Sequence, residues 1–336
     1  MFLKMENGQF GDNLITIGLP DYKGWLSYSQ INYLGFHRLK KTTKPSSRSK
    51  KCLWFTHPAF PSLINLHKWD RIAYDCSDFW SSPWVNRRGM KGYYQKIKNH
   101  LLVTSEERIA NFSDVVCATS EFLAEYIYSL TNKKVLVVEN GVEVELFSKS
   151  QDEYLDVLQD IPKPRLGFVG GLKSKIDFEL LEYLAKKRPN YNIVLIGPIS
   201  QELSKSLASL FELKNVFLIG GVPPDRVPYY MRSLDLGLLP YKQIEYNKAV
   251  SPLKLFEYLG AGKAAVGIGL PTTRKYSQEG IYYYADDYTD FLKSCDYVIE
   301  QLTLDGQNVE NRILIAKGND WKNKLKEIYN KVIGGY

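Results

Sequence analysis

Short apolar runs alternate along the chain with longer stretches in which apolar residues recur at helical spacing. Runs that are only a few residues long and end near Pro, Asp, Ser or Asn are typical of strands buried on both faces of a parallel sheet. The first series predicts strands at 14–19, 51–55, 71–74, 115–118 and 135–138, and helices at 28–40, 91–112 and 121–130. Ser120 is placed to cap the last of these helices, with acidic Glu121 in its first turn.

A second series begins after the polar stretch 148–163. It predicts strands at 165–169, 192–196, 216–218, 236–238, 264–268 and 281–284, with helices at 178–187, 201–210, 225–233 and 252–259. Two consecutive series imply an α/β chain with two Rossmann-like, doubly wound parallel sheets. Ligands of such sheets lie beyond the carboxyl ends of the strands, here in a cleft between two domains.

The composition is that of an ordinary globular protein. The 336 residues are 44% hydrophobic and 24% charged, which suits two domains with cores of their own. Four scattered cysteines without a Cys-x-x-Cys pair favour reduced thiols and a cytoplasmic protein. No apolar run approaches the length of about 18 residues that a spanning helix needs, and residues 1–12 do not resemble a signal peptide.

The formal charge of +7 indicates an anionic partner. Seven Lys and Arg residues lie within 38–51, just after Trp25, Tyr28, Tyr33 and Phe36. Two interpretations stay open for this basic segment: a solvated loop, or contact with an anionic membrane surface at the inner face of the cell membrane. Nucleic acid is not expected, because no recognised binding motif accompanies the charge.

The most informative segment is the predicted helix that starts after Ser251. Ser251 is a good N-cap, and Pro252 suits the first helical turn. The helix start therefore offers backbone N–H groups and a positive dipole end to a diphosphate. Lys254 adds a positive charge one turn in, and the Glu257 carboxylate on the same side can accept hydrogen bonds from two vicinal hydroxyls. The structural alternative is a capped amphipathic helix with an exposed Lys–Glu pair.

Asp75 and Asp78 follow the predicted strand 71–74 and are expected to point into the cleft. Transfer to an acceptor hydroxyl with inversion needs one carboxylate as a base, and the pair could supply that base and a residue that orients it. The alternative is that both residues cap turns. The sequence does not choose between the two Asp residues.

Two other charged clusters are predicted to be structural. Glu106, Glu107 and Arg108 are expected in interdomain salt bridges or on a solvated face, with acceptor contact as the alternative. Asp286 and Asp287 are expected in a solvated turn. No metal site is predicted, because the sequence shows no set of metal ligands; the positive helix start and Lys254 would carry leaving-group charge in place of a divalent ion.

An ordered set of short motifs runs over almost the whole chain, and a late Trp321 completes it. The motifs are Val138-Glu139-Asn140-Gly141-Val142-Glu143, Phe168-Val169-Gly170-Gly171, Leu195-Ile196-Gly197-Pro198, Gly221-Val222-Pro223, Asp235-Leu236-Gly237-Leu238-Leu239-Pro240 and Ser251-Pro252-x-Lys254-x-x-Glu257-Tyr258-Leu259. Together they resemble GT-B glycosyltransferases. Within that class, Leu53-Trp54-Phe55-Thr56-His57-Pro58 followed by Tyr74-Asp75-Cys76-Ser77-Asp78 is similar to teichuronic-acid glycosyltransferases of Gram-positive cell-wall synthesis. The spacing of the donor helix also resembles the xanthan glucuronosyltransferase.

The resemblance implies a GT-B fold and the division of the chain. Residues 1–160 would form the acceptor-side domain, which lacks its first strand relative to the family. Residues 161–316 would bind the nucleotide-sugar, and 317–336 would be a C-terminal helix packed back on the first domain.

The resemblance also implies the donor contacts. Lys254 would neutralise the diphosphate, Glu257 would bind the ribose, and uracil would lie against 221–223. The position eight residues before Glu257 holds Ala249, where many retaining relatives carry a second Glu. The remaining expected donor contacts, through side chain or backbone, are Gly170, Gly171, Lys173, Tyr241, Asn247, Ser251 and Pro252.

The expected function is a metal-independent glycosyltransferase. It would move a sugar from a UDP-sugar, with UDP-glucuronate favoured, to a lipid-linked cell-envelope glycan, and it would need no cofactor besides its donor substrate. Two alternatives stay open: a non-catalytic subunit that binds a nucleotide-sugar or a glycan, and a UDP-sugar 2-epimerase.

Overall fold

The computed structural model describes residues 51–82, 89–148, 156–200, 203, 207–251, 253–302 and 306–332. The predicted elements at 14–19 and 28–40, nearly all of the basic segment 38–51, and Pro252 lie outside the described residues. Within the described ranges, no helix combines the length and apolar character that crossing a bilayer requires.

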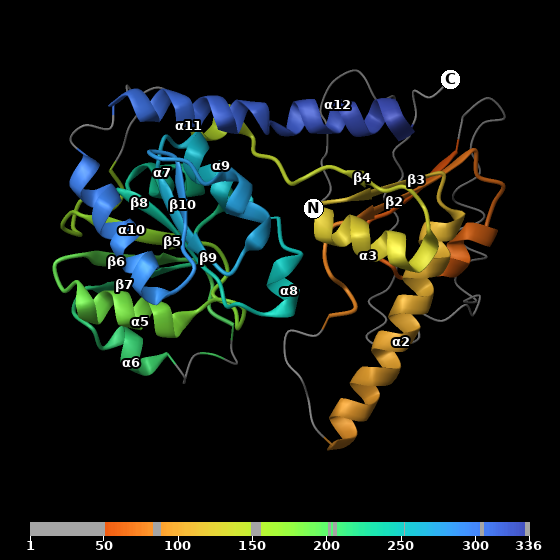
Figure 1. Cartoon of the computed structure of the whole chain (residues 1–336), viewed down its shortest axis with the longest axis horizontal. Coiled ribbons are helices and arrows are strands. Elements are labelled where there is room, and N and C mark those ends of the chain that lie inside the picture. The colour runs from red at the N-terminus through yellow and green to blue at the C-terminus, as the bar shows by residue number, and fades with distance from the viewer. Residues whose placement is uncertain are drawn as a thin grey trace.

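The first sheet has four parallel strands in the order β1-β2-β3-β4 (Figure 1). Helices α2 and α3 cover one of its faces, where Tyr74, Ile109 and Leu123 are fully buried in one apolar cluster. Ser120 caps α3 as predicted, since its Oγ accepts from the Leu123 amide at 3.3 Å. The elements of this first domain are β1 (Cys52–Phe55), η2 (Pro61–Asn65), β2 (Arg71–Cys76), α2 (Gly89–Phe112), β3 (Val115–Ala118), α3 (Glu121–Thr131) and β4 (Leu136–Val137). The next helix along the chain, α4 (Val144–Phe147), packs in the core of the second sheet.

The other face of this sheet is covered by the last described helix, α12 (Trp321–Val332) (Figure 1). Ile328 is 6% exposed and packs in an apolar cluster with Ala73 of β2. The chain crosses over near Gly141, where a Cβ would stand 2.7 Å from the Asn319 carbonyl oxygen. A side chain at that position would push the two segments apart. The domain limits at 160 and 316 themselves remain a prediction.

The second sheet has six parallel strands in the order β10-β9-β8-β5-β6-β7. Strands β5, β6, β8 and β9 are almost entirely buried, as continuous apolar runs predict for a sheet covered on both faces, whereas the edge strand β7 is partly exposed. The elements are β5 (Arg165–Val169), α5 (Phe178–Lys187), β6 (Asn192–Ile196), α6 (Ala208–Phe211), β7 (Val216–Gly220), η4 (Pro224–Arg226), α7 (Val227–Arg232), β8 (Leu236–Pro240), α8 (Glu245–Lys248), α9 (Leu253–Gly260), β9 (Ala265–Ile268), η5 (Pro271–Tyr276), β10 (Tyr282–Tyr284), α10 (Tyr288–Gln301) and α11 (Gly306–Gly318).

Most predicted elements lie where the apolar pattern put them, but two helices differ. The helix predicted at 201–210 is reduced, within the described residues, to the short α6. The helix predicted at 225–233 starts as the 3₁₀ turn η4 before α7. Pro224 and Pro228 explain the second difference, because each removes a backbone donor from the first turns.

The packing of α12 on the first sheet generates a stability prediction. Ile328→Ala should lower the free energy of unfolding by about 2–3 kcal/mol, because it removes buried methyl groups and leaves a cavity. Leu314→Ala on α11 is the matched control, since Leu314 is 67% exposed and its loss should cost less than about 0.5 kcal/mol. Urea unfolding measures both variants. Equal stabilities would contradict the docking of α12.

Candidate functional site

The carboxyl ends of β5 and β8 mark the switch point of the second sheet. There β5 pairs with β6 on one side and with β8 on the other, so the chain winds away in opposite directions. Open α/β sheets bind ligands at such points. Gly170 directly follows β5 and Tyr241 directly follows β8, so the topology brings these two predicted donor residues to the expected place.

The turn after β5 lies against the turn after β6, backbone to backbone. A Cβ at Gly197 would stand 2.0 Å from the Gly170 carbonyl oxygen, and both glycines have positive φ, 145° and 153°. Any larger residue at Gly197 would therefore displace the turn. This close approach makes 170–171 a ledge of main chain, which the phosphates of a ligand can reach without meeting a side chain from the ledge itself.

Lys254 of α9 reaches this ledge, and Glu257, one turn further along the same helix, pairs with it. Lys254 Nζ donates to Glu257 Oε2 at 2.7 Å, and the two side chains are 24% and 15% exposed. Lys254 Cε stands 3.4 Å from where a Cβ of Gly170 would lie, so the lysine stem passes over the turn. The alternative of an exposed Lys–Glu pair is wrong, since both side chains are partly buried at the switch point.

Tyr241 and Lys175 form the next layer of the site. Burial and, after it, the Glu257 carboxylate raise the pKa of Tyr241. Lys175 Nζ lies 5.9 Å from the centre of the Tyr241 ring and 5.4 Å from that of Tyr246. Burial lowers the pKa of Lys175, an effect that the Asp78 carboxylate opposes. The two aromatic rings therefore hold a partly buried ammonium group between the β5 loop and the first domain.

Lys173, the lysine predicted from the sequence, is exposed and lowers the pKa of Lys175 by repulsion. Lys173 and Lys175 thus both follow the turn at 170–171. Lys175, the more buried of the two, was not among the predicted site residues. Tyr246 was also missed. No sequence signal marks a tyrosine whose ring packs against a lysine from another loop.

Asn247 and Ser251 are buried and hold the loops beside the site. Asn247 Nδ2 donates to the carbonyl oxygens of Lys175 at 3.2 Å and Lys242 at 2.8 Å. Ser251 Oγ accepts from the Asn140 amide at 3.2 Å, and its carbonyl oxygen accepts from Asn140 Nδ2 at 2.6 Å. Direct contact of Asn247 or Ser251 with a donor stays a prediction.

Asp75 and Asp78 do not form the predicted pair. Strand β2 continues through Cys76, so Asp75 lies inside the strand, beside Cys117 of β3. Because side chains alternate along a strand, Asp75 shares with Cys117 the face that α12 covers. Asp78 lies beyond the strand, and its Oδ1 accepts from Tyr246 Oη at 2.5 Å. Of the two carboxylates, Asp78 is the one that meets the second domain.

Glu106 lies in the core of the first domain, so the prediction of an interdomain salt bridge or a solvated face is wrong for this residue. It is completely buried, and its carboxylate accepts from Tyr74 Oη at 2.5 Å, Tyr126 Oη at 3.1 Å and Cys76 Sγ at 3.5 Å. Burial raises the pKa of Glu106, and the three donors oppose that shift. Cys76 Sγ also lies 3.6 Å from the Asp78 carbonyl oxygen, so this network underlies the loop that carries Asp78.

The segment 245–251 fastens the second domain to the first. Ser120 Oγ donates to the Ala249 carbonyl oxygen at 2.9 Å, and Ala249 itself is 1% exposed within the apolar cluster of the first domain. The bonds of Tyr246 and Asn140 described above act at the two sides of this contact. The position that carries a second Glu in many retaining relatives is therefore used here for domain packing.

The turn at Asp286 and Asp287 is solvated, as predicted. Both residues are exposed; Asp286 pairs with Arg274, and Asp287 Oδ1 caps α10 by accepting from the Asp290 amide at 2.8 Å. Across the part of the chain that the structure describes, no group of three or more His, Cys, Asp or Glu side chains could hold a metal ion.

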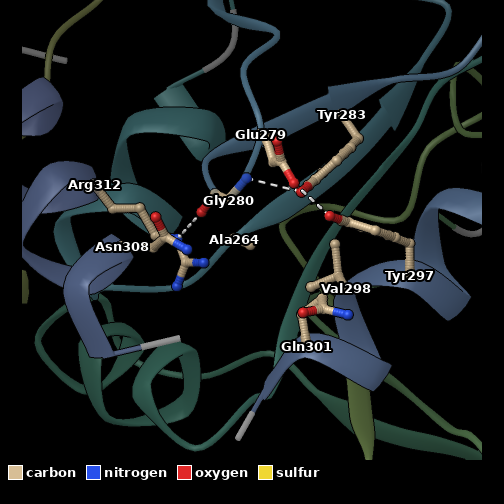
Figure 2. A pocket seen from close by; sticks show the side chains of 9 residues that line it. All are labelled: Ala264, Glu279, Gly280, Tyr283, Tyr297, Val298, Gln301, Asn308 and Arg312. Atoms are coloured by element: carbon tan, nitrogen blue, oxygen red, sulfur yellow. Dashed lines mark hydrogen bonds between the residues drawn. The ribbon is translucent and has the colours of Figure 1, made fainter. Parts of the chain in front are cut away.

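The hollow shown in Figure 2 lies elsewhere, among β10, α10 and α11. Tyr297 Oη donates to the Glu279 carboxylate there, and Arg312 Nε donates to the Gly280 carbonyl oxygen at 2.6 Å. None of the predicted donor residues lines it, and its polar groups bond to one another across the packed elements.

No family model matches the chain. Among solved structures, HepE (Alr3699) of Anabaena in complex with UDP superposes with a TM-score of 0.68 at 13% identity, covering 88% of this chain and 81% of that one. Sucrose-phosphate synthase of Thermosynechococcus elongatus gives 0.67 at 13% identity, covering 90% and 80%. The two parallel sheets, of four and six strands in the described residues, and these likenesses define the fold as GT-B, a fold of glycosyltransferases.

The sequence comparison narrows this class. The chain is 37% identical over 297 residues to TuaH of Bacillus subtilis (strain 168), a protein named as a teichuronic acid biosynthesis glycosyltransferase, and the match covers 86% of this chain and 74% of that protein. The chain belongs to the family of the TuaH glycosyltransferase. The resemblance inferred from the motifs is thereby confirmed.

The environment of Asp75 generates a pH prediction. Burial raises its pKa to about 6, above the value of about 3.9 expected in the unfolded chain. The protonated form is therefore favoured by folding, and this stabilisation is present below pH 4 and lost as the pH rises through 6. Between pH 4 and 7, the free energy of unfolding of the wild type should fall by about 2 kcal/mol relative to Asp75→Asn. Chemical unfolding across this range measures the difference; a difference independent of pH would contradict the burial of this carboxyl group.

Proposed function

We propose that this glycosyltransferase takes its sugar from a UDP-sugar bound at the carboxyl ends of β5 and β8. The observation that supports this most directly is the convergence of the 170–171 ledge, Lys254 and Glu257 at the switch point. HepE, which shares the fold, has been solved with UDP and with UDP-glucose. A nucleotide-sugar therefore suits this architecture.

The proposed donor contacts divide the work between charge and hydrogen bonding. Lys254 and the amides at the start of α9 stabilise the diphosphate as it leaves, without a metal ion. The Glu257 carboxylate orients Lys254 through Oε2 and, having a second oxygen, can accept from the ribose hydroxyls. The uracil ring lies against the loop 221–223.

The proposal also names the catalytic base, the transferred sugar and the acceptor. Asp78 deprotonates the acceptor hydroxyl, with Tyr246 holding one carboxylate oxygen in place. Lys173 and Lys175, which follow the glycine turn, suit an acidic sugar such as glucuronate. The acceptor is a lipid-linked glycan of the cell envelope, reached at the cytoplasmic face of the membrane.

Removal of the Lys254 ammonium group tests the donor site. Lys254→Ala should weaken UDP binding by about 30-fold, because a charge-assisted contact with the diphosphate is worth about 2 kcal/mol. Lys186→Gln is the matched control, since Lys186 is an exposed lysine that also pairs with a glutamate, on α5. Isothermal titration calorimetry with UDP measures both; undiminished affinity of Lys254→Ala would remove the basis of the proposal.

Replacement of Asp78 tests the base. Asp78→Asn should retain UDP affinity and lose transfer by at least about 100-fold, as expected when a general base is removed. The test is an assay of sugar transfer from a UDP-sugar to envelope glycolipids. Transfer at the wild-type rate would exclude Asp78 as the base. Formation of an isomeric UDP-sugar without acceptor would indicate an epimerase, and UDP binding without any transfer by the wild type a non-catalytic subunit.

A further inference from the structure

Helix α2 has apolar residues on two different faces. Its second half faces the core of the first domain, where Leu102, Ile109 and Ala110 are buried. Its first half projects away from both sheets (Figure 1). The large apolar side chains of this half remain exposed: Met90 at 69%, Tyr93 at 61%, Tyr94 at 61% and Ile97 at 38%.

These four side chains form one stripe along the helix. Positions spaced by three, four and seven residues fall within about 100° of one face at 3.6 residues per turn. We call Met90, Tyr93, Tyr94 and Ile97 the α2 stripe. The same turns place exposed lysines at its borders, and the sequence has no acidic residue between 89 and 105. The bordering lysines are Lys91 and Lys98 on one side and Lys96 on the other.

We propose that the α2 stripe lies in the surface of a bilayer that contains anionic lipid. Tyrosine suits the boundary between headgroups and acyl chains, where its ring is buried and its hydroxyl stays wet. Lysine side chains beside such a stripe extend their stems along the apolar surface and place the ammonium groups among anionic headgroups. A helix with an apolar stripe and a purely basic border has the pattern of one that lies in the interface rather than across it.

One lysine at the border of the α2 stripe is linked electrostatically to the surroundings of the proposed acceptor site. Burial lowers the pKa of His57; Lys98, at the border of the stripe, lowers it further, while Asp78 raises it, so His57 lies within electrostatic reach of both. The His57 ring packs edge-on against Trp80, two residues after Asp78, with centroids 4.2 Å apart. A membrane along the stripe would therefore bring lipid-linked substrates to the Asp78 loop. This last step rests on the proposed function; the membrane contact does not.

Vesicle flotation of the full chain tests the proposal. The wild type should float with vesicles of phosphatidylglycerol and phosphatidylcholine, and much less with phosphatidylcholine alone. Tyr93→Ser/Tyr94→Ser/Ile97→Ser should bind the mixed vesicles about tenfold more weakly. Tyr128→Ser/Leu314→Ser, at exposed sites on α3 and α11, is the matched control and should bind like the wild type.

A separate variant tests the contribution of the bordering lysines to membrane binding. Lys91→Gln/Lys96→Gln should also weaken binding about tenfold, and added salt should then lower it less than in the wild type. Lys214→Gln/Lys293→Gln, on exposed positions of the second domain, should leave binding unchanged.

Three results would overturn the proposal. One is a wild type that does not bind the mixed vesicles; another is a stripe variant that binds them as tightly as the wild type. The third is a dimer in light scattering that the stripe variant loses, because a second copy would then cover the stripe. UDP titration of the stripe variant should match the wild type, so a failed donor site and a failed membrane contact give different results.

Discussion

The structure depends on the contact between segment 245–251 and the first domain. This segment leads directly into α9, so the bonds that hold it also fix where the donor helix begins. Tyr246 meets Asp78 at one side and Asn140 meets Ser251 at the other, while Ala249 lies in the apolar cluster of the first domain between them. Each bond is modest, but together they place groups from two separately built sheets within one site.

The 170–171 ledge is the second feature on which the proposed donor site depends. Its shape follows from strand order, because β5 lies between β6 and β8 and its turn must pass against the turn after β6. Lys254 crosses this ledge from α9, and Lys175 approaches from the β5 loop between two aromatic rings. A diphosphate at this point would meet positive charge from two elements of the second domain, α9 and the β5 loop.

The parts that the sequence predicted well are those with local causes. Strand β5 and helix α5 match their predicted limits because a continuous apolar run and a capped amphipathic stretch depend only on neighbouring residues. The relation between Lys254 and Glu257 was equally predictable, since three residues on a helix bring two side chains to one side.

The parts that the sequence did not predict depend on contacts distant along the chain. Two more residues in β2 place Asp75 inside the strand and turn it toward α12, which separates it from Asp78. Glu106 has the appearance of a surface carboxylate, yet three donors from β2 and α3 satisfy it in the core. Tyr246 and Lys175 come from separate loops of the second domain, and only the folded chain brings them together.

Hydrogen exchange with and without UDP tests the central claim most directly, because it reports on the backbone at the donor site itself. UDP should slow exchange of the α9 amides and of the turn at 170–171, and should leave exchange around the hollow of Figure 2 unchanged. Unchanged exchange at α9 with slowing at another place would contradict that claim.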